Sequence, residues 1–455
     1  MRFLSLSLLL CLLLLFACKK DSFTNSPDAN LQTSVDTLKY DTVFTTVGSV
    51  TQSFKIFNNN DQKLRLSSVK LAGGSASAFQ MNVDGVAGAV VNDLVIEAND
   101  SLYVFVQVKV DPVSGNLPFI IRDSIGISYN GNEKWVQLEA WGQHAHFFRD
   151  RQIVADETWT NDLPYVIQGF LYIEPGVTLT IEKGSRIYVH ADAPIIVDGT
   201  MKVNGLKDTA DRVYFQGDRL DEPYSHFPAA WPGIYFGPLS IDNEFNYAVL
   251  KNAYQAIALE ELATNGNPKL VLNECVIDNA YDAGIIAVGS SIVAVNCLVS
   301  NCGRNIVLGE GGDYHFTHCT VASYANAFVN HKDPVLTVSN AGAAASLNAQ
   351  FRNCIFWGDG GLVENEVMVT KEGAGMFTVH FDHSLWKVQA TPAHVTANQM
   401  INQDPRFDSI DVSRRYYDFR LKDDSPARNS GMVTSVPIDL EGKPRPVGIA
   451  DRGCF

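Results

Sequence analysis

The chain has 455 residues, of which 46% are hydrophobic and 19% are charged, and its formal net charge is −15. This length and apolar fraction exclude a wholly disordered chain and indicate either several domains or one domain with a repeat array. The acidic balance, without any run rich in Lys or Arg, argues against a nucleic-acid partner and against electrostatic docking on anionic lipid. Eight cysteines are too few for a disulfide scaffold of this length.

The first residues have the pattern of an export signal. Arg2 precedes an apolar run from Leu4 to Ala17, which has the length of a signal-peptide core and is too short to span a bilayer. The run ends in Leu15-Phe16-Ala17-Cys18, which resembles the bacterial lipobox. This resemblance implies that residues 1–17 are removed and that lipid on Cys18 anchors the chain to the outer membrane of a Gram-negative-type bacterium, on its periplasmic or cell-surface face. The alternative is a plain secretory signal, which the large Leu15 side chain disfavours.

The next two segments are a tether and a β-sandwich. Residues 18–34 are polar and without periodicity, which predicts a flexible tether. From residue 35 to 145 apolar residues alternate with polar ones, as in Leu102, Val104, Val106 and Val108, and turn-forming clusters separate the runs. This pattern predicts short strands in a sandwich.

Three stretches of that segment carry a resemblance to a known domain. Residues 48–54, 100–102 and 138–142 resemble the abnormal-spindle/hydin-type Ig-like domains. The resemblance implies a spacer or a docking surface without a catalytic set.

A repeat array fills the second half of the chain. Cys275, Cys297 and Cys319 are spaced 22 residues apart, and each lies within a similar apolar segment. This period is close to one turn of a parallel β-helix. Cys354 follows after 35 residues, so that turn contains an insertion, which we place at residues 339–346. Ala248 and Ser384 occupy the cysteine position in the flanking repeats.

The aligned repeats predict two corners in every turn. Apolar residues recur three positions before the cysteine and two positions after it, and one straight strand cannot bury both sets. The first corner therefore falls just before the cysteine, on residues expected to face water, and the second falls four residues after it. The first column contains Tyr247, Glu274, Asn296, His318, Asn353 and His383, and the second contains Asn252, Asn279, Asn301, Ser323 and Gly358.

The ends of the array carry a second resemblance. Residues 174–184, 195–205 and 231–236, together with the terminal stretches 404–407, 417–421 and 439–446, resemble right-handed parallel β-helix repeat proteins. The resemblance implies an all-β chain, in which an N-terminal Ig-like β-sandwich is followed by a right-handed parallel β-helix of nine or ten turns. We place this β-helix at residues 150–390 and a C-terminal closing segment at 391–455.

Metal binding has little support in the sequence. Stacked at one position of successive turns, Cys275, Cys297, Cys319 and Cys354 would form a buried structural ladder, because a free cysteine behaves as a small hydrophobe. Two His-x-x-His spacings occur at residues 315–318 and 380–383, but on a strand this spacing places the two rings on opposite faces. We predict no metal and no cofactor, and the state of Cys302 and Cys454 stays open.

Polysaccharide cleavage is the enzymatic alternative, since many β-helix proteins are pectate lyases or related hydrolases. A hydrolase needs two carboxylates, and a lyase needs Ca²⁺ or a basic residue beside the acidic sugar. Candidate groups are Asp278 with Asp282, Asp218 with Asp221 and Glu222, and Asp192 with Asp198. Aspartates at corners are ordinary, however, and no lyase motif matches. The long loop from Asp218 to His226 is the place where we expect a groove.

Ligand binding without catalysis is the favoured interpretation. Aromatic side chains that could stack on sugar rings are Tyr224, Phe227, Tyr281, Tyr324 and Trp357, with core packing as the other role for each. The sequence thus predicts a cell-envelope lipoprotein that acts as a binding or adhesion module with a glycan as candidate ligand. The alternative is a polysaccharide lyase or glycoside hydrolase acting on an acidic polysaccharide, with Ca²⁺ needed only in the lyase case. The oligomeric state stays open.

Overall fold

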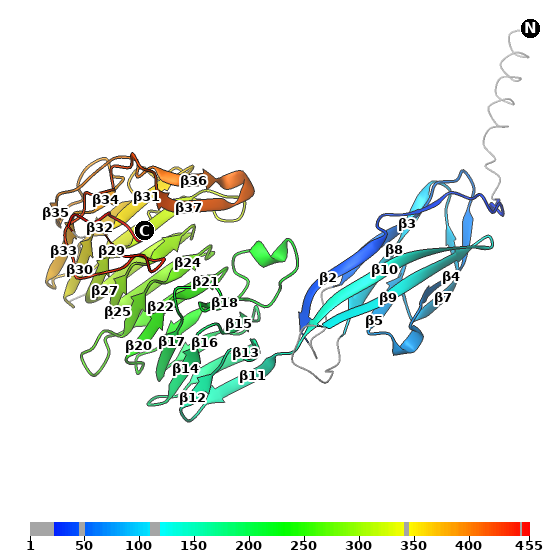
Figure 1. Ribbon diagram of the computed structural model, residues 1–455, viewed down its shortest axis with the longest axis horizontal. Coiled ribbons are helices and arrows are strands. Elements are labelled where there is room, and N and C mark those ends of the chain that lie inside the picture. The colour runs from blue at the N-terminus through cyan, green and yellow to red at the C-terminus, as the bar shows by residue number, and fades with distance from the viewer. Residues whose placement is uncertain (1–21, 45–50, 110–118, 341–344, 446–447) are drawn as a thin grey trace, which may run out of the picture. The chain divides into compact units, whose positions relative to one another are not determined.

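The chain forms two compact units in the computed structural model, which describes residues 22–44, 51–109, 119–340, 345–445 and 448–455 (Figure 1). One unit ends at His144 and the other spans Ala145–Phe455. The predicted signal segment and Cys18 lie outside the described residues. Within those residues no helix has both the length and the apolar character required to cross a bilayer.

The N-terminal unit consists of two five-stranded sheets around one hydrophobic core, with the orders β1-β3-β8-β5-β6 and β2-β10-β9-β4-β7. On β8, Leu102, Val104 and Val106 are buried in this core, because alternate side chains of a strand point to the same face. The arrangement is compatible with an Ig-like sandwich. Its elements are β1 (Leu31–Thr33), β2 (Thr37–Phe44), β3 (Gln52–Asn58), β4 (Leu64–Leu71), η1 (Gly74–Ala76), β5 (Phe79–Val83), β6 (Val86–Ala87), β7 (Val90–Ile96), β8 (Asp100–Val108), β9 (Phe119–Tyr129) and β10 (Asn132–Gln143).

The first strand lies inside the segment expected to be a tether. β1 pairs in antiparallel fashion with β3, and both Ala29 and Leu31 are buried. Residue 23 also forms an isolated bridge with Lys63. The ordered unit therefore begins earlier than the polar composition indicated, since pairing with β3 supplies hydrogen-bond partners that composition does not reveal.

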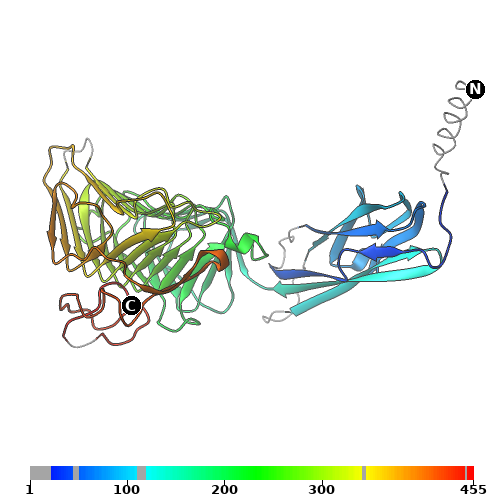
Figure 2. The same ribbon diagram turned by 90° about the horizontal axis from the view of Figure 1, so that it is seen from above.

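The C-terminal unit contains a sheet of 25 strands, β11 to β35, all paired in parallel, and most of these strands pair with the strand three places later in the chain. The strands therefore fall on three faces, and their inward side chains form one continuous core. This stack is compatible with a parallel β-helix and is seen from two sides in Figures 1 and 2. The first strands are β11 (His146–Ile153), β12 (Glu157–Trp159), β13 (Tyr165–Ile173), β14 (Thr178–Glu182), β15 (Arg186–Val189), β16 (Ile195–Val197), β17 (Thr200–Asn204), β18 (Val213–Gly217), β19 (Ile234–Phe236), β20 (Asn243–Asn246), β21 (Ala248–Lys251) and β22 (Gln255–Glu260), with η2 (Tyr224–His226) between β18 and β19.

The remaining strands continue the same three faces, and β25 and β27 are long enough to contribute to two of them. We name face B the one formed by β15, β18, β21, β24, β26, β28, β31 and β34. The strands are β23 (Leu270–Asn273), β24 (Val276–Asp278), β25 (Ala283–Val295), β26 (Leu298–Ser300), β27 (Arg304–Thr317), β28 (Thr320–Tyr324), β29 (Leu336–Ser339), β30 (Leu347–Arg352), β31 (Ile355–Asp359), β32 (Val367–Thr370), β33 (Phe377–Asp382), β34 (Leu385–Trp386) and β35 (Val395–Asn398).

The first predicted corner is present in every aligned turn. All six residues before the cysteine position have positive φ, from 46° at His383 to 54° at His318. The expectation that this column faces water is wrong for Asn296, His318 and Asn353, whose exposed fraction is 0%. The C-terminal segment covers them. Arg445 donates to Asn296, Thr434 bonds to His318, and Asn353 donates to the Met432 carbonyl.

The second corner is confirmed only in part. Asn252, Asn279 and Asn301 have φ of 62°, 59° and 53°. Ser323 and Gly358 instead lie within β28 and β31, because longer loops follow these strands. The insertion is also placed differently. Residues 325–335 separate β28 from β29 and take up most of the extra length, while residues 340–346, partly outside the described residues, take up the rest.

The closing segment runs back along the outside of face B. After β35 the chain forms the hairpin of β36 (Phe407–Asp411) and β37 (Tyr416–Leu421) with η3 (Val412–Arg414) between them. The rest of the segment, dark red in Figures 1 and 2, lies along the side of the stack. Its apolar residues form a second core with outward residues of face B. These are Leu298, Ala322, Ile355 and Leu385 of the stack with Phe407, Phe419, Ala427, Leu440 and Cys454 of the segment.

Candidate ligand-binding groove

The closing segment leaves the earlier part of face B open. Along this face Tyr214 pairs with Val249, and Val249 pairs with Val276, which is followed by the covered Leu298. A parallel column places Lys251 beside Asp278. Two cavities lie on this open part, and they share Lys251 as a lining residue.

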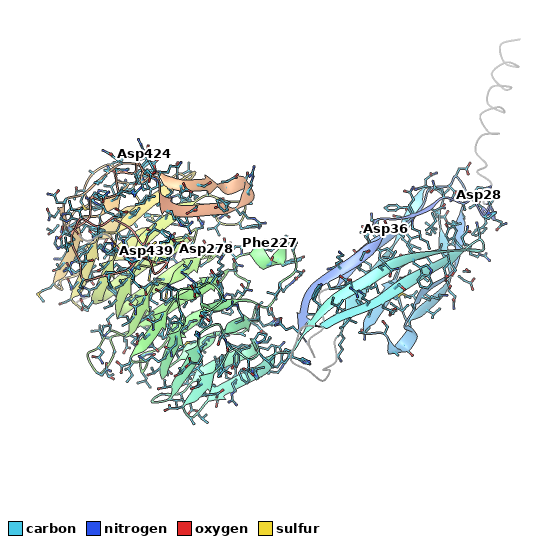
Figure 3. The ribbon with its side chains drawn as sticks, viewed as in Figure 1. Asp28, Asp36, Phe227, Asp278, Asp424 and Asp439 are labelled. Carbon is cyan, nitrogen blue, oxygen red and sulfur yellow. The ribbon has the colours of Figure 1, made fainter. Side chains whose placement is uncertain are left out.

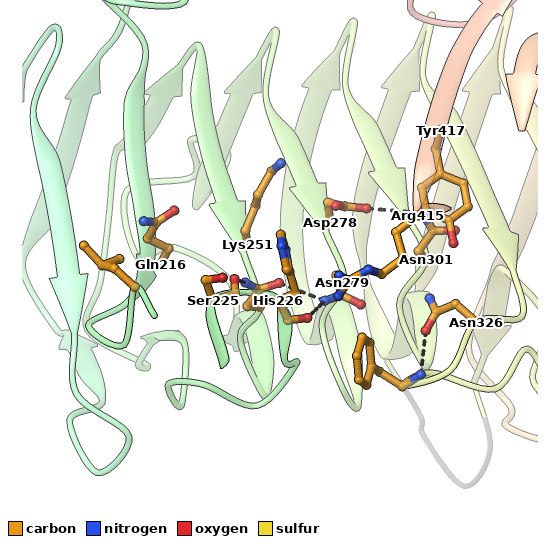
Figure 4. Close-up of a pocket in the computed structure, with 13 residues that line it drawn as sticks. Gln216, Ser225, His226, Lys251, Asp278, Asn279, Asn301, Asn326, Arg415 and Tyr417 are labelled. Carbon is orange, nitrogen blue, oxygen red and sulfur yellow. Dashed lines mark hydrogen bonds between the residues drawn. The ribbon is translucent and has the colours of Figure 1, made fainter. Parts of the chain in front are cut away.

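The first cavity, cavity 1, has a volume of about 430 Å³ (Figure 4). Four parts of the C-terminal unit contribute to it: face B with its second corner, the loop of residues 218–230, the inserted loop of residues 325–335, and the β36–β37 hairpin. The residues lining it are Gln216, Leu220, Ser225, His226, Lys251, Asn252, Asp278, Asn279, Asn301, Asn326, Phe328, Arg415 and Tyr417.

The corner asparagines hold the loop of residues 218–230 in place. Asn252 Nδ2 donates to the Ser225 carbonyl at 2.8 Å, and Asn279 Nδ2 donates to the His226 carbonyl at 3.1 Å and to Asn252 Oδ1 at 2.8 Å. These residues tolerate the left-handed backbone that the corner requires, and their amides then point out of the turn. The corner that shapes the stack therefore also positions one wall of the cavity.

Aromatic contacts connect that loop with the other two walls. The ring of Phe227 lies 5.2 Å from that of Tyr224 and 4.9 Å from that of Phe328, measured between ring centroids. The guanidinium of Arg415 lies 5.4 Å from the Phe328 centroid, a cation–π contact. Figure 3 labels Phe227 and Asp278 in this part of the C-terminal unit.

Two cations, Lys251 and Arg415, line cavity 1. Among the described residues no carboxylate forms an ion pair with Lys251 or with Arg415. Asp278 is engaged by hydrogen bonds from Ser300 Oγ at 2.7 Å and Asn301 Nδ2 at 3.3 Å. Burial raises the pKa of Tyr417, and the Asp278 charge adds to this effect, so the hydroxyl stays protonated and available as a donor.

The second cavity, cavity 2, has a volume of about 480 Å³ and lies on the other side of Lys251. Its floor is formed by face B and its walls by the loop before β18 and by the closing segment, where Arg212 Nη2 donates to the Leu440 carbonyl at 2.9 Å. The residues lining it are Lys207, Asp208, Thr209, Arg212, Tyr214, Val249, Lys251, Val276, Glu441 and Lys443.

Of the candidate catalytic carboxylates, one lines cavity 1 or cavity 2. Asp278 lines cavity 1, whereas Asp282 pairs with Arg304 at 2.6 Å. In the loop of residues 218–230, Asp218 pairs with His190 at 2.7 Å, Asp221 with Arg219 at 3.0 Å, and Glu222 with His226 at 2.8 Å.

Burial raises the pKa of Asp218, and the bond from His190 opposes this effect. Asp198 accepts a hydrogen bond from the Tyr172 hydroxyl at 3.0 Å, and Asp192 lines neither cavity. No second carboxylate lines cavity 1 among the described residues, so the pair that a hydrolase requires is not assembled there.

The candidate aromatic residues lie around the cavities and not in their linings. Tyr224 and Phe227 belong to the loop beside cavity 1, and Tyr281 is 53% exposed and stacks on Tyr254 at 5.9 Å. Tyr324 and Trp357 pack against the closing segment. The aromatic residues that line cavity 1 are Phe328 and Tyr417, which sequence reasoning missed. Phe328 comes from an inserted loop and Tyr417 from the closing segment. Only the folded stack brings them beside the much earlier residues of face B and of the loop of residues 218–230.

The cysteine column is buried in the core of the stack. Cys275, Cys297, Cys319 and Cys354 are at most 1% exposed, and each thiol lies within hydrogen-bond distance of a backbone carbonyl. All cysteines of the described residues, Cys302 and Cys454 included, are free.

Three of the four histidines in the His-x-x-His spacings have carboxylate or hydroxyl partners. His315 pairs with Asp313 at 3.1 Å, His383 pairs with Asp382 at 2.8 Å, and His318 bonds to Thr434 at 3.0 Å. Within the part of the chain that the structure describes, no three His, Cys, Asp or Glu residues are grouped so that they could hold a metal ion.

Comparison with known proteins gives no family. No protein-family model matches the chain, and no curated protein matches it. Among solved structures, the chain is similar over 25% of its length to 26% of a family 123 glycoside hydrolase from Clostridium perfringens, with 10% identity and a TM-score of 0.18. It is similar over 27% of its length to 89% of an ASH/PapD-like domain of human CEP192, with 12% identity and a TM-score of 0.18. A third similarity, to Pseudomonas fluorescens alkylpurine DNA glycosylase AlkC, covers 26% of this chain and 31% of that one, with 10% identity and a TM-score of 0.17. The chain thus spans about a quarter of the first of these proteins.

Proposed function

We propose that the protein is an exported lipoprotein that binds a glycan in cavity 1 without cleaving it. In this proposal residues 1–17 are removed, lipid on Cys18 anchors the chain to the outer membrane, and an Ig-like spacer precedes a right-handed parallel β-helix that presents the binding site. The observation that carries the proposal is the lining of cavity 1, where five carboxamide side chains lie together with two aromatic rings and two cations without ion-pair partners.

This lining has the chemistry that sugars require. A carboxamide offers a donor and an acceptor side by side, which matches neighbouring hydroxyl groups of a pyranose ring. Among the described residues the Gln216 amide has no hydrogen-bond partner, so it keeps this full capacity. The four asparagine amides already bond to loop or corner atoms and keep only part of it. Phe328 and Tyr417 provide apolar surface for the C–H face of the ring, and Tyr417 adds a hydroxyl donor. The volume of about 430 Å³ lies within the range of ordinary small-molecule sites.

Direct binding measurements test the glycan proposal. The full chain is solubilised in a detergent without sugar groups and titrated calorimetrically with neutral and acidic oligosaccharides. Gln216 lies on β18 at the floor of cavity 1, so Gln216→Ala is expected to weaken binding about five- to tenfold, the value of one or two lost hydrogen bonds. Gln80→Ala, an exposed strand position of the N-terminal unit, is the matched control and should leave binding unchanged.

The same titrations have two contradicting outcomes. Equal affinity of Gln216→Ala and the unchanged protein would place binding elsewhere. Accumulation of unsaturated products or new reducing ends during incubation would contradict a non-catalytic role and favour the lyase or hydrolase alternative.

The anchor is tested separately by Cys18→Ser. Serine lacks the thiol to which lipid is attached, so the variant is expected in the soluble fraction after cell disruption, while the unchanged chain sediments with membranes. Mass spectrometry of the N-terminal peptide should show acyl groups on Cys18 only in the unchanged chain. Retention of Cys18→Ser in the membrane fraction would count against the proposed anchor.

A further inference from the structure

We propose that cavities 1 and 2 form one continuous site for an acidic glycan chain, whose anionic groups are bound by cations on both sides of Lys251. This inference rests on the proposed function and specifies its ligand. Its first support is geometric. Lys251 lines both cavities, and each of three strands of face B contributes one residue to cavity 2 and one to cavity 1. These pairs are Tyr214 and Gln216 on β18, Val249 and Lys251 on β21, and Val276 and Asp278 on β24.

The second support is the balance of charge. Lys207, Arg212, Lys251 and Arg415 line the joined cavities, and within the described residues none of them has a carboxylate in ion-pair contact. Arg212 donates to the backbone carbonyls of Lys207 and Leu440, and its guanidinium lies 5.4 Å from the Tyr247 ring centroid. Its charge also opposes the burial that raises the pKa of Glu274. Four such cations gather here in a chain whose net charge is −15, so the local charge is opposite to that of the whole molecule.

The carboxylates of the groove are mostly committed to other partners. Glu441 accepts from both Arg420 and Lys443, and the bond from Arg420 lowers the pKa of Glu441 to about 2. Asp278 is bonded to Ser300 and Asn301. Asp208 is the remaining carboxylate in either lining. The neutral donors leave Asp278 its charge, so the two linings together hold five cations and three carboxylates, and their formal balance is positive.

The third support is the position of the closing segment. It covers the later part of face B and stops beside cavity 2, where the Cβ of a side chain at Gly442 would lie within 3.0 Å of the Lys207 stem. The open part of the face is therefore bounded by the segment at one side and by the hairpin with Arg415 at the other.

A polymer is favoured over a single acidic sugar because the cations are divided between two cavities. Lys207 and Arg212 line only cavity 2, Arg415 lines only cavity 1, and Lys251 lines both. One sugar ring in cavity 1 can use Lys251 and Arg415, whereas a chain with acidic groups on neighbouring rings can engage all four. Affinity should therefore rise with chain length until both cavities are filled, and then level off.

The experiment measures fluorescence anisotropy with the full chain in a detergent without sugar groups. The probes are labelled oligogalacturonates of two to eight rings, their methyl esters of equal length, and a single-stranded oligonucleotide of equal charge. The acidic chain is expected to bind at least tenfold more tightly than its ester, with an affinity that falls as salt is raised. Equal affinity for the ester would overturn the inference and leave neutral glycan binding intact. Equal affinity for the oligonucleotide would also overturn it, because it would show an unspecific polyanion surface.

Three charge variants locate the two halves of the site. Lys251→Gln is expected to lose about five- to tenfold in affinity for chains of every length, and Arg415→Gln a similar factor. Lys207→Gln should weaken binding of the longer chains only, with the shortest chain unaffected. Lys371→Gln, exposed and outside both linings, is the matched control. If Lys207→Gln leaves all lengths unchanged while Arg415→Gln reduces them, cavity 2 is not part of the site, although the proposed function stands. If no glycan binds, the proposed function itself fails.

Discussion

The residue before each cysteine position has a left-handed backbone in all six turns, although its side chain changes from Asn to His, Glu or Tyr. Asparagine adopts this conformation at little cost, whereas larger side chains do so only when other contacts hold them. At His318 these contacts are hydrogen bonds to Asn353 and Thr434, both at 3.0 Å. The closing segment thus stabilises a corner that the local sequence does not favour.

His318 gives the first prediction, on the pH dependence of stability. Burial, with the nearby Arg445 charge, lowers its pKa to about 3, against about 6.5 in an unfolded chain. Between these values the unfolded chain binds a proton that the folded chain does not. The stabilisation is therefore complete above pH 6.5 and is lost as pH falls toward 3.

His318→Asn removes this proton uptake, and asparagine already occupies the same corner in two neighbouring turns. The free energy of unfolding of the unchanged protein should decrease by about 1.4 kcal/mol more per pH unit than that of the variant between pH 6 and pH 4. Urea titrations at several pH values measure this slope. His315→Asn, at a half-buried position of β27, is the control and should keep the original slope. An unchanged slope in His318→Asn would contradict the assignment.

At the scale of elements, the cysteine column and the corners are the features that can be predicted best from the sequence alone. Side chains at Cys275, Cys297, Cys319 and Cys354 repeat within one short segment, so a fixed period places them on one another without knowledge of distant contacts. The closing segment is different. Its position depends on outward residues such as Leu298 and Ile355, and no local pattern distinguishes an apolar residue covered by a later segment from one that is exposed.

The buried column gives the second prediction. Burial raises the pKa of Cys297 and Cys354, and it raises that of Cys454 to about 12, so these thiols are neither accessible nor ionised at neutral pH. Iodoacetamide is expected to leave all six cysteines of the described residues unmodified in the native protein and to modify them after denaturation. Peptide mass spectrometry measures the modified fraction. Rapid native modification at Cys297 or Cys354 would contradict the buried ladder.

The closing segment gives the third prediction. Arg445 donates to Asn296 Oδ1 at 2.7 Å, to the Ile438 carbonyl at 3.0 Å and to the Gly453 carbonyl at 3.1 Å. Arg445→Met keeps the apolar stem but removes the donor to Asn296 Oδ1 and to the Gly453 carbonyl, while the Ile438 carbonyl keeps its bond from Asn296 Nδ2. The expected cost is about 2–4 kcal/mol of unfolding free energy. Arg414→Met, whose guanidinium is exposed, should change stability by less than about 0.5 kcal/mol. Similar values for the two variants in urea unfolding would mean that the segment contributes little.

At the scale of the whole molecule, the two units have separate hydrophobic cores. We therefore expect two unfolding transitions in calorimetry. Val104→Ala removes buried volume from the N-terminal core and should lower the unfolding free energy of that unit alone, by about 2–4 kcal/mol. Ile277→Ala should lower the unfolding free energy of the C-terminal unit alone. A single transition that shifts with both variants would show that the units unfold together.

The candidate groove could be predicted from the sequence only in outline. Period and corners indicated the parallel stack, and the loop of residues 218–230 was expected beside a groove, as the structure places it. Phe328, Arg415 and Tyr417 could not be assigned, because their place depends on how an insertion and a terminal hairpin fold back onto turns formed much earlier in the chain.

The closing segment has one more consequence, for the order in which the site is completed. A stack of repeats contacts only its neighbours, so early turns can form while later ones are still being made. Here, however, Leu440 and Gly442 contact residues 207–212, and Arg415 reaches the same open face from the hairpin. A chain that has lost its last 50 residues could still form most of its turns, yet it would lack two boundaries of the groove. Under the proposed function, ligand binding would therefore require the β36–β37 hairpin and the segment that contains Leu440.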